Sequence, residues 1–87
     1  MVYVYRIQSR KSPSFGYTGY TTNLKQRLAQ HNSGEVASTS RFAPFGLVFY
    51  AAFPDKRTGR NFEDYLKTGS GKAFARKRLW PSSEDNC

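Results

Sequence analysis

The stretch that decides the fold is residues 17–31, which read YTGYTTNLKQRLAQH. This order predicts the end of a strand, a turn at Gly19, and then a helix from about residue 22 to residue 32. Thr21 or Thr22 can cap that helix, because a hydroxyl at this point accepts a hydrogen bond from a free N–H group of the first turn. The chain is therefore expected to pass from sheet to helix within a few residues.

The predicted helix places an arginine and a histidine beside its apolar face. Successive helical residues are rotated by about 100°, so one continuous arc carries Leu24, Leu28, Arg27 and His31. Arg27 and His31 lie one turn apart, at the edge of the side that faces the core. Tyr17 leads toward them from the preceding strand. A cationic pair in this position indicates a functional site.

Three strands are expected around this helix. Residues 2–7 are rich in β-branched and aromatic side chains, which is typical of a strand. A short loop over residues 8–14 makes residues 15–18 the antiparallel partner of the first strand. Residues 47–53 are apolar throughout, which predicts a central strand that is covered on both faces.

Two further helices complete the predicted order. Gly34 stands where a helix end favours a left-handed residue, and residues 35–46 form a loop. A second helix spans residues 58–67. Its buried positions, three and four residues apart, are Phe62, Tyr65 and Leu66. A third helix follows a cap on Ser70.

Pro81 is expected to stop the third helix after Trp80, and residues 81–87 form a polar tail that is predicted to be disordered. The sequence therefore predicts a single α+β domain over residues 1–80. Its architecture is a small three-stranded antiparallel sheet flanked by about three helices, in the order β-β-α-β-α-α.

The composition limits the class of protein. A chain of 87 residues is one domain with a small core, and its net charge of +8 attracts polyanions such as nucleic acid, acidic protein or an anionic membrane surface. A lone cysteine, Cys87, excludes an internal disulfide and a zinc–cysteine cluster. No apolar run of about 18 residues and no signal-peptide pattern is present. We therefore expect a cytoplasmic or nuclear location and no membrane partner.

Two tyrosines and one glutamate are the further candidates for chemistry. Tyr5 and Tyr17 lie on neighbouring strands, where they either pack with wet hydroxyls or form a pair that takes or relays a proton beside Arg27 and His31. A phenol of pKa ~10 is only about 0.1% ionised at pH 7, so it needs cationic neighbours to act as a base. Glu63 is either an ordinary helix acid or, with water and phosphate oxygens, a ligand for Mg²⁺ or Mn²⁺.

Basic residues suggest where nucleic acid would lie. Residues 69–72 read GSGK, like the end of a phosphate-binding loop, but Ala73 stands where that loop requires Ser or Thr and the upstream glycine is missing. A nucleotide-hydrolase loop is therefore excluded. The residues that we expect to contact nucleic acid are Arg10, Lys11, Arg41, Lys72, Arg76 and Lys77. The alternative is a solvated charged surface.

These residues resemble the motifs of the GIY-YIG endonuclease domain, in its compact stand-alone branch. Residues 3–5, Tyr-Val-Tyr, look like the Gly-Ile-Tyr motif, and residues 17–19, Tyr-Thr-Gly, look like the Tyr-Ile-Gly motif. Arg27 falls on the family arginine, His31 on a position held by His or Tyr, and Glu63 on the metal-binding glutamate. The resemblance covers about residues 2–80.

The resemblance implies hydrolysis of DNA phosphodiester bonds by direct water attack, with one Mg²⁺ or Mn²⁺ ion. Glu63 would hold the ion, and Tyr5, assisted by Tyr17 or His31, would deprotonate or orient the water. Arg27 would position water and phosphate and stabilise charge in the transition state. Branched, flapped and damaged DNA are the substrates considered.

The chain departs from the family pattern in three places. Tyr3 replaces the first glycine, and Tyr20 stands where some members carry a lysine. Residues 64–85 contain no Asn or Gln where many members have an Asn, so Ser70 or Lys72 would have to take that role.

Two other interpretations stay open from the sequence. One is a nucleic-acid-binding module with the same fold and little or no catalysis. The other is a protein-interaction role with aromatic anchors at Phe42, Phe45 or Trp80. RNA is a second possible nucleic acid. We expect no attached targeting domain, so a partner protein could supply specificity.

Overall fold

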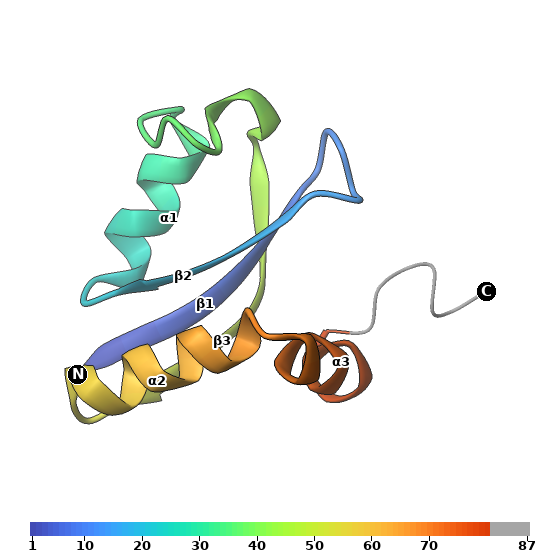
Figure 1. Ribbon diagram of the computed structural model, residues 1–87. Helices are drawn as coiled ribbons and strands as arrows, with labels where there is room; N and C mark the ends of the chain where they lie inside the picture. Colours follow the sequence, from blue (N-terminus) through green and yellow to red (C-terminus); the bar gives the residue numbers. More distant parts are fainter. Residues whose placement is uncertain (81–87) are drawn as a thin grey trace.

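The computed structural model describes residues 1–80 and confirms the α+β class and the predicted order of elements (Figure 1). The elements are β1 (Val2–Ser9), β2 (Gly16–Thr21), α1 (Leu24–Asn32), a short 3-10 helix η1 (Ser40–Phe42), β3 (Phe45–Phe53), α2 (Lys56–Leu66) and α3 (Gly69–Arg78). The tail predicted over residues 81–87, with its stop at Pro81, lies outside the described residues. Within residues 1–80, no helix is long and apolar enough to cross a bilayer. The cytoplasmic or nuclear location stays a prediction.

The central strand of the sheet is β1, and the prediction that residues 47–53 form the central strand is wrong. The strand order is β2-β1-β3, and β1 pairs antiparallel with both neighbours. The outer strand β3 exposes Leu47 and Val48, and the side chain of Tyr50 is 54% exposed. The apolar run therefore does not mark a strand covered on both faces.

A β-bulge explains why Phe45 and Phe53 of β3 pack on opposite faces of the sheet. Arg6 faces Phe49 across the ladder, whereas Ile7 faces Leu47, so Val48 is an extra residue without a partner on β1. An extra residue reverses the alternation of side chains between the two faces. Phe45, before the bulge, therefore packs on the α1 side of the sheet, and Phe53, after the bulge, packs on the opposite side.

The sheet separates two small cores. On the α1 side, the buried residues Tyr5, Ile7 and Phe45 pack with Leu24 and Leu28. On the other side, Val4, Leu66 and Ala75 form a cluster with Phe53, Phe62, Leu79 and Trp80. Figure 1 shows α1 on one side of the strands, with α2 and α3 on the other. The exposed side chain of Tyr65 lies outside both cores, so its predicted burial is wrong.

The junction of β2 and α1 differs from the expected one. Gly19 lies inside β2, opposite Tyr5, and does not form a turn. The cap of α1 is Asn23 and not a threonine, because the Asn23 side chain accepts the backbone N–H of Gln26 at 3.1 Å. Thr21 instead accepts the backbone N–H of Asn23 at 3.1 Å, which turns the chain into the helix. Gly34 has φ of 82° and ends the helix as predicted.

The second glycine of the GSGK segment, Gly71, allows α2 and α3 to pack closely. Thr68, and not Ser70, caps α3, since its hydroxyl accepts the backbone N–H of Gly71 at 3.0 Å. Gly71 is buried at the junction of α2 and α3, where an added Cβ would collide with the carbonyl oxygen of Tyr65. This close approach explains the glycine without a bound phosphate.

Replacing Gly71 with alanine is expected to lower the free energy of unfolding by roughly 1–3 kcal/mol, because the new methyl group forces α3 away from α2. Gly69→Ala is the matched control, since nothing lies within 4 Å of a Cβ at that position. That change should be neutral or stabilise the helix by up to about 1 kcal/mol. Urea unfolding, followed by the fluorescence of Trp80, measures both. Equal effects of the two variants would contradict this account of the junction.

Candidate active site

The centre of the candidate site is the buried phenol of Tyr5, which is 1% exposed. Its oxygen lies 2.7 Å from Nε2 of His31, within hydrogen-bond distance. The other ring nitrogen of His31, Nδ1, lies 2.8 Å from the hydroxyl oxygen of Thr39. Strand β1, helix α1 and the loop before η1 thus meet in one buried chain of polar groups.

Tyr17 completes the aromatic wall of this site. Its ring centroid is 6.4 Å from that of Tyr5 and 5.1 Å from that of His31. Tyr17 faces Ile7 in the antiparallel ladder, and Gly19 faces Tyr5. Tyr5 and Tyr17 therefore share the sheet face that α1 covers, as their strand positions predicted.

Gly19 provides the space for the phenol. A Cβ at this position would lie 2.5 Å from the hydroxyl oxygen of Tyr5 and 2.9 Å from Cε2 of Tyr17. The ring of Tyr5 is fully buried between those of Tyr17 and His31, so it cannot yield easily. The glycine of the Tyr-Thr-Gly motif is thus required by the close approach of Tyr5 to the backbone of β2.

Opposing effects set the pKa of Tyr5, and the net result is a rise. Burial is the largest effect and raises the pKa, because it disfavours the charged phenolate. Hydrogen bonding and positive charge from Arg27 lower it, whereas Tyr17 and the carboxylate of Glu63 raise it. Arg27 and Glu63 are therefore both near enough to Tyr5 to act on its ionisation. At neutral pH the phenol keeps its proton.

The pKa of His31 is lowered, first by burial and then by the charge of Arg27. The imidazole is therefore neutral at pH 7, with one nitrogen able to accept a proton. Arg27 lies one turn earlier on α1 and donates from Nη1 to Oε1 of Gln30 at 3.1 Å. The arginine thus favours negative charge on Tyr5 and disfavours positive charge on His31.

Glu63 comes from α2 and stands apart from the hydrogen-bonded pair. Its side chain is 14% exposed, and Oε2 forms a salt bridge of 3.0 Å with Nζ of Lys67, whose side chain is 53% exposed. Within residues 1–80, no three side chains of His, Cys, Asp or Glu gather as a metal cluster. A lone carboxylate fits Mg²⁺ or Mn²⁺ only where water and phosphate oxygens fill the other positions.

Comparison with known proteins identifies the family. Residues 1–78 match the family model described as the GIY-YIG catalytic domain. The chain belongs to the GIY-YIG family. It is a family of endonuclease domains, and the resemblance drawn from the sequence motifs is confirmed.

The relatives are small GIY-YIG proteins named UPF0213. One from Pediococcus acidilactici is 42% identical over 59 residues, which cover 64% of this chain and 60% of that protein. One from Streptococcus pyogenes serotype M5 is 44% identical over 52 residues, or 59% of this chain and 56% of that protein. The chain thus spans less than two thirds of these curated relatives. The solution NMR structure of a UPF0213 protein from Bacillus halodurans is 31% identical, with a TM-score of 0.54, over 99% of this chain and 93% of that one.

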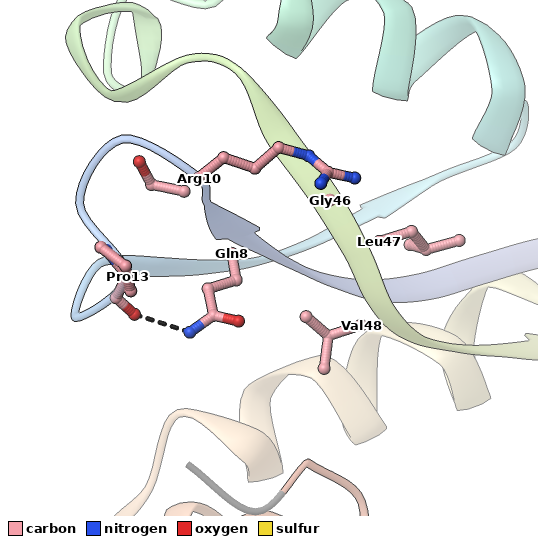
Figure 2. A pocket seen from close by; sticks show the side chains of 7 residues that line it. Gln8, Arg10, Pro13, Gly46, Leu47 and Val48 are labelled. Atoms are coloured by element: carbon pink, nitrogen blue, oxygen red, sulfur yellow. Dashed lines mark hydrogen bonds between the residues drawn. The ribbon is translucent and has the colours of Figure 1, made fainter. Parts of the chain in front are cut away.

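The six basic residues of this GIY-YIG domain that are predicted to contact nucleic acid lie in two groups on different elements. Arg10, Lys11 and Arg41 form the hairpin group, in which Nζ of Lys11 donates to the carbonyl of Arg41 at 3.5 Å. The α3 group consists of exposed residues on one helix, Lys72, Arg76 and Lys77. An open hollow of about 400 Å³ lies beside the hairpin. Figure 2 shows Arg10, which lines it, extending along Gly46. The catalytic candidates lie elsewhere in the described part of the chain.

The three aromatic residues considered as protein anchors pack within the domain. Phe45 is buried with Tyr5 and Ile7. Phe42 stacks on Phe15 with ring centroids 3.9 Å apart. Trp80 packs against the second core, under the guanidinium of Arg6 at 5.1 Å from the ring centroid. These contacts place the three rings in the packing of the domain, with Phe42 and Trp80 half-buried, and the protein-interaction role stays a hypothesis.

Thr39 and Lys67 are the site residues that sequence reasoning missed. Thr39 lies in a loop rich in Ser and Thr, and no local pattern distinguishes a buried hydroxyl from its exposed neighbours. Lys67 could have been found, because it lies four residues after Glu63 on one helix, the spacing of an ordinary ion pair.

Gly19→Ala is expected to push the Tyr5 phenol away from His31 and to cost roughly 1–3 kcal/mol of unfolding free energy. The control is Gly46→Ala, also in a strand, whose Cβ would meet only the guanidinium end of the exposed Arg10. Urea unfolding gives the stability, and ¹⁵N NMR of the His31 ring reports the contact with Tyr5. An unchanged ring spectrum in Gly19→Ala would refute the assigned role of the glycine.

Acidification is expected to destabilise the protein through His31. The pKa of His31 is lower in the folded chain than its usual 6.5, so the unfolded chain binds more protons in the range below that value. Stability should therefore be fully present above about pH 6.5 and fall as the pH drops through the folded pKa. Urea unfolding between pH 4.5 and pH 7.5 should show a shallower dependence in His31→Gln than in the wild type. Equal dependence in both would exclude His31 as the cause.

Proposed function

We propose that this chain is a metal-dependent endonuclease that hydrolyses phosphodiester bonds of DNA with one divalent ion, Mg²⁺ or Mn²⁺. The observation that carries the proposal is the 2.7 Å contact between the buried phenol of Tyr5 and a neutral His31, with Arg27 and Glu63 acting on the same phenol. The family contributes the reaction class.

Tyr5 and His31 form a proton relay in this proposal. The phenol oxygen accepts a proton from the attacking water as its own proton passes to Nε2 of His31. The water oxygen then attacks phosphorus, and the bond from phosphorus to the leaving oxygen breaks. Burial keeps the imidazole neutral beforehand and so ready to accept. The ring of Tyr17 packs beside both members of the relay.

Arg27 supplies the fixed positive charge of the reaction. Its charge and hydrogen bonding favour a negative phenol oxygen, which offsets part of the cost of burial at Tyr5. The same guanidinium can stabilise charge that builds on the phosphate in the transition state. Its neighbour on the helix, Gln30, holds Nη1 at 3.1 Å and limits its freedom.

Glu63 is the residue that would hold the divalent ion. The exposed Lys67 is bound by a single contact of 3.0 Å and can rotate into solvent to release the carboxylate. A bound ion would supply Lewis-acid stabilisation of the phosphate and the leaving oxygen. The fit is to a site completed by substrate oxygens and water, since residues 1–80 hold no cluster of three His, Cys, Asp or Glu side chains.

The two basic groups are the proposed contacts with nucleic acid. The exposed side chains of the hairpin group and of the α3 group can neutralise backbone phosphates, which makes binding weaken with salt. Backbone contacts carry no sequence information, so substrate choice would come from DNA shape or from a partner protein. RNA shares the same phosphates and is included in the test.

A nucleic-acid-binding module with little or no catalysis is the second candidate. The observation in its favour is the salt bridge that already occupies Glu63, together with the net charge of +8. In that case the fold would bind phosphates through its basic groups, and Tyr5 and His31 would serve the core alone.

The test is cleavage of labelled single-stranded, duplex, flap and four-way-junction DNA, with a single-stranded RNA arm, in Mg²⁺, Mn²⁺ or EDTA. Glu63→Gln and Tyr5→Phe should each reduce cleavage by roughly 100-fold or more, since each removes one charge or proton-transfer role and leaves the shape. Arg76→Gln is the matched control on α3, and it should weaken binding and its salt dependence without abolishing cleavage.

The outcomes separate the two candidates. Metal-dependent cleavage that both site variants lose, with folding and binding intact, supports the endonuclease. Binding without cleavage on every substrate supports the binding module. Cleavage that survives Glu63→Gln would place the metal site elsewhere.

A further inference from the structure

A loop threonine faces the candidate site from the side opposite to Tyr5. Thr39 is fully buried, immediately before η1, and its hydroxyl oxygen lies 2.8 Å from Nδ1 of His31. His31 itself is fully buried, with Tyr5 on its other nitrogen at 2.7 Å. Buried polar groups rarely lack partners, so this hydroxyl determines how the imidazole can be protonated.

The direction of these hydrogen bonds follows from counting protons. The hydroxyl of Thr39 donates to the carbonyl oxygen of Val36 at 3.4 Å. The buried phenol of Tyr5 has Nε2 of His31 as its hydrogen-bond partner, so it donates its proton there, and the oxygen of Thr39 is left to accept from Nδ1–H of His31. A neutral imidazole carries one N–H, so Nε2 then presents a lone pair to Tyr5. The phenol can donate to it, while the positive charge of Arg27 acts on the same phenol.

We propose that Thr39 is a positioning residue, which holds His31 in its Nδ1–H tautomer and so leaves Nε2 free to accept the proton of Tyr5. The tautomer is a property of the folded chain alone. Its consequence for cleavage rests on the proposed nuclease function.

Within residues 1–80, the other groups around His31 offer no acceptor for a proton on Nδ1, which makes the hydroxyl of Thr39 important for the tautomer. The rings that pack on the imidazole are Tyr5, Tyr17 and Phe45, with centroids between 5.1 and 5.9 Å away. The charged group that acts on it is Arg27, on its own helix. An aromatic ring or a cation cannot accept Nδ1–H as an oxygen does, so Thr39 is the acceptor that the described residues place at Nδ1.

A neutral partner also suits a relay better than a carboxylate would. An acid at this position would stabilise the imidazolium and hold the proton on His31. A hydroxyl orients the ring without adding charge, so the proton can return to Tyr5 after each turnover. Thr39 thereby orients the imidazole of His31 without stabilising a positive charge on it.

The test is ¹⁵N NMR of the imidazole in the full chain, which is unambiguous because the protein has one histidine. The wild type should show Nδ1 protonated and Nε2 unprotonated at pH 7.5. Thr39→Val keeps the shape but removes the acceptor, and it should shift the population toward the Nε2–H form by several-fold. Thr39→Ser restores the hydroxyl and should restore the wild-type spectrum.

Thr18→Val is the matched control. Thr18 is also buried, but its hydroxyl accepts from Nη1 of Arg6 at 3.1 Å on the other side of the sheet. This substitution should leave the His31 ring signals unchanged. Thermal unfolding of every variant establishes that the spectra report folded protein.

Cleavage kinetics give the second readout. Thr39→Val should lower kcat by roughly tenfold or more with KM unchanged, and Thr39→Ser should recover most of that loss. An Nε2–H tautomer in the wild type, or an unchanged tautomer in Thr39→Val, would overturn the proposal. A tautomer shift in a protein that cleaves nothing would support the role of Thr39 and overturn the nuclease function, so the two failures are distinguishable.

Discussion

The contact of the Tyr5 phenol with His31, in the space left by Gly19, is the constraint that organises the domain. A buried phenol needs a partner for its hydroxyl, and the imidazole provides it at 2.7 Å. The ring fits only because β2 carries no side chain opposite it. The register of the hairpin and the position of α1 are thus tied to one side chain, and an error in either would leave a buried polar group unpaired.

The same strand supports stability on one face and the candidate chemistry on the other. Side chains alternate along β1, so Val4 enters the core with α2 and α3, whereas Tyr5 faces α1. Placement at the centre of the sheet holds both faces rigid through two ladders. A site on this strand is therefore pre-organised by the packing that also stabilises the fold. Glu63 lies on α2, the helix that covers the other face of the sheet.

Local pattern was enough to predict most of the elements and the residues that gather at Tyr5, because helical spacing and strand alternation act over short distances. It failed where a long-range contact decides the structure. Gly19 resembled a turn residue, yet its missing side chain leaves room for the ring of Tyr5 on the neighbouring strand. The apolar run of β3 suggested a central strand, because a bulge at Val48 cannot be seen in one strand alone. The burial of Thr39 depends on where η1 docks, which no local pattern reveals.

Burial shifts the two members of the pair in opposite directions, and this has a consequence for the proposed reaction. A raised pKa at Tyr5 and a lowered pKa at His31 both disfavour the separated phenolate and imidazolium. At pH 7 less than about 0.1% of such a phenol is ionised, so the pair holds no phenolate that could act as a base before the substrate binds. Proton transfer then requires an added positive field at the moment of attack. Arg27 supplies part of it, and a cation on Glu63 with the bound phosphate would supply the rest. A relay of this kind stays inactive toward water alone and acts only when the substrate completes the site.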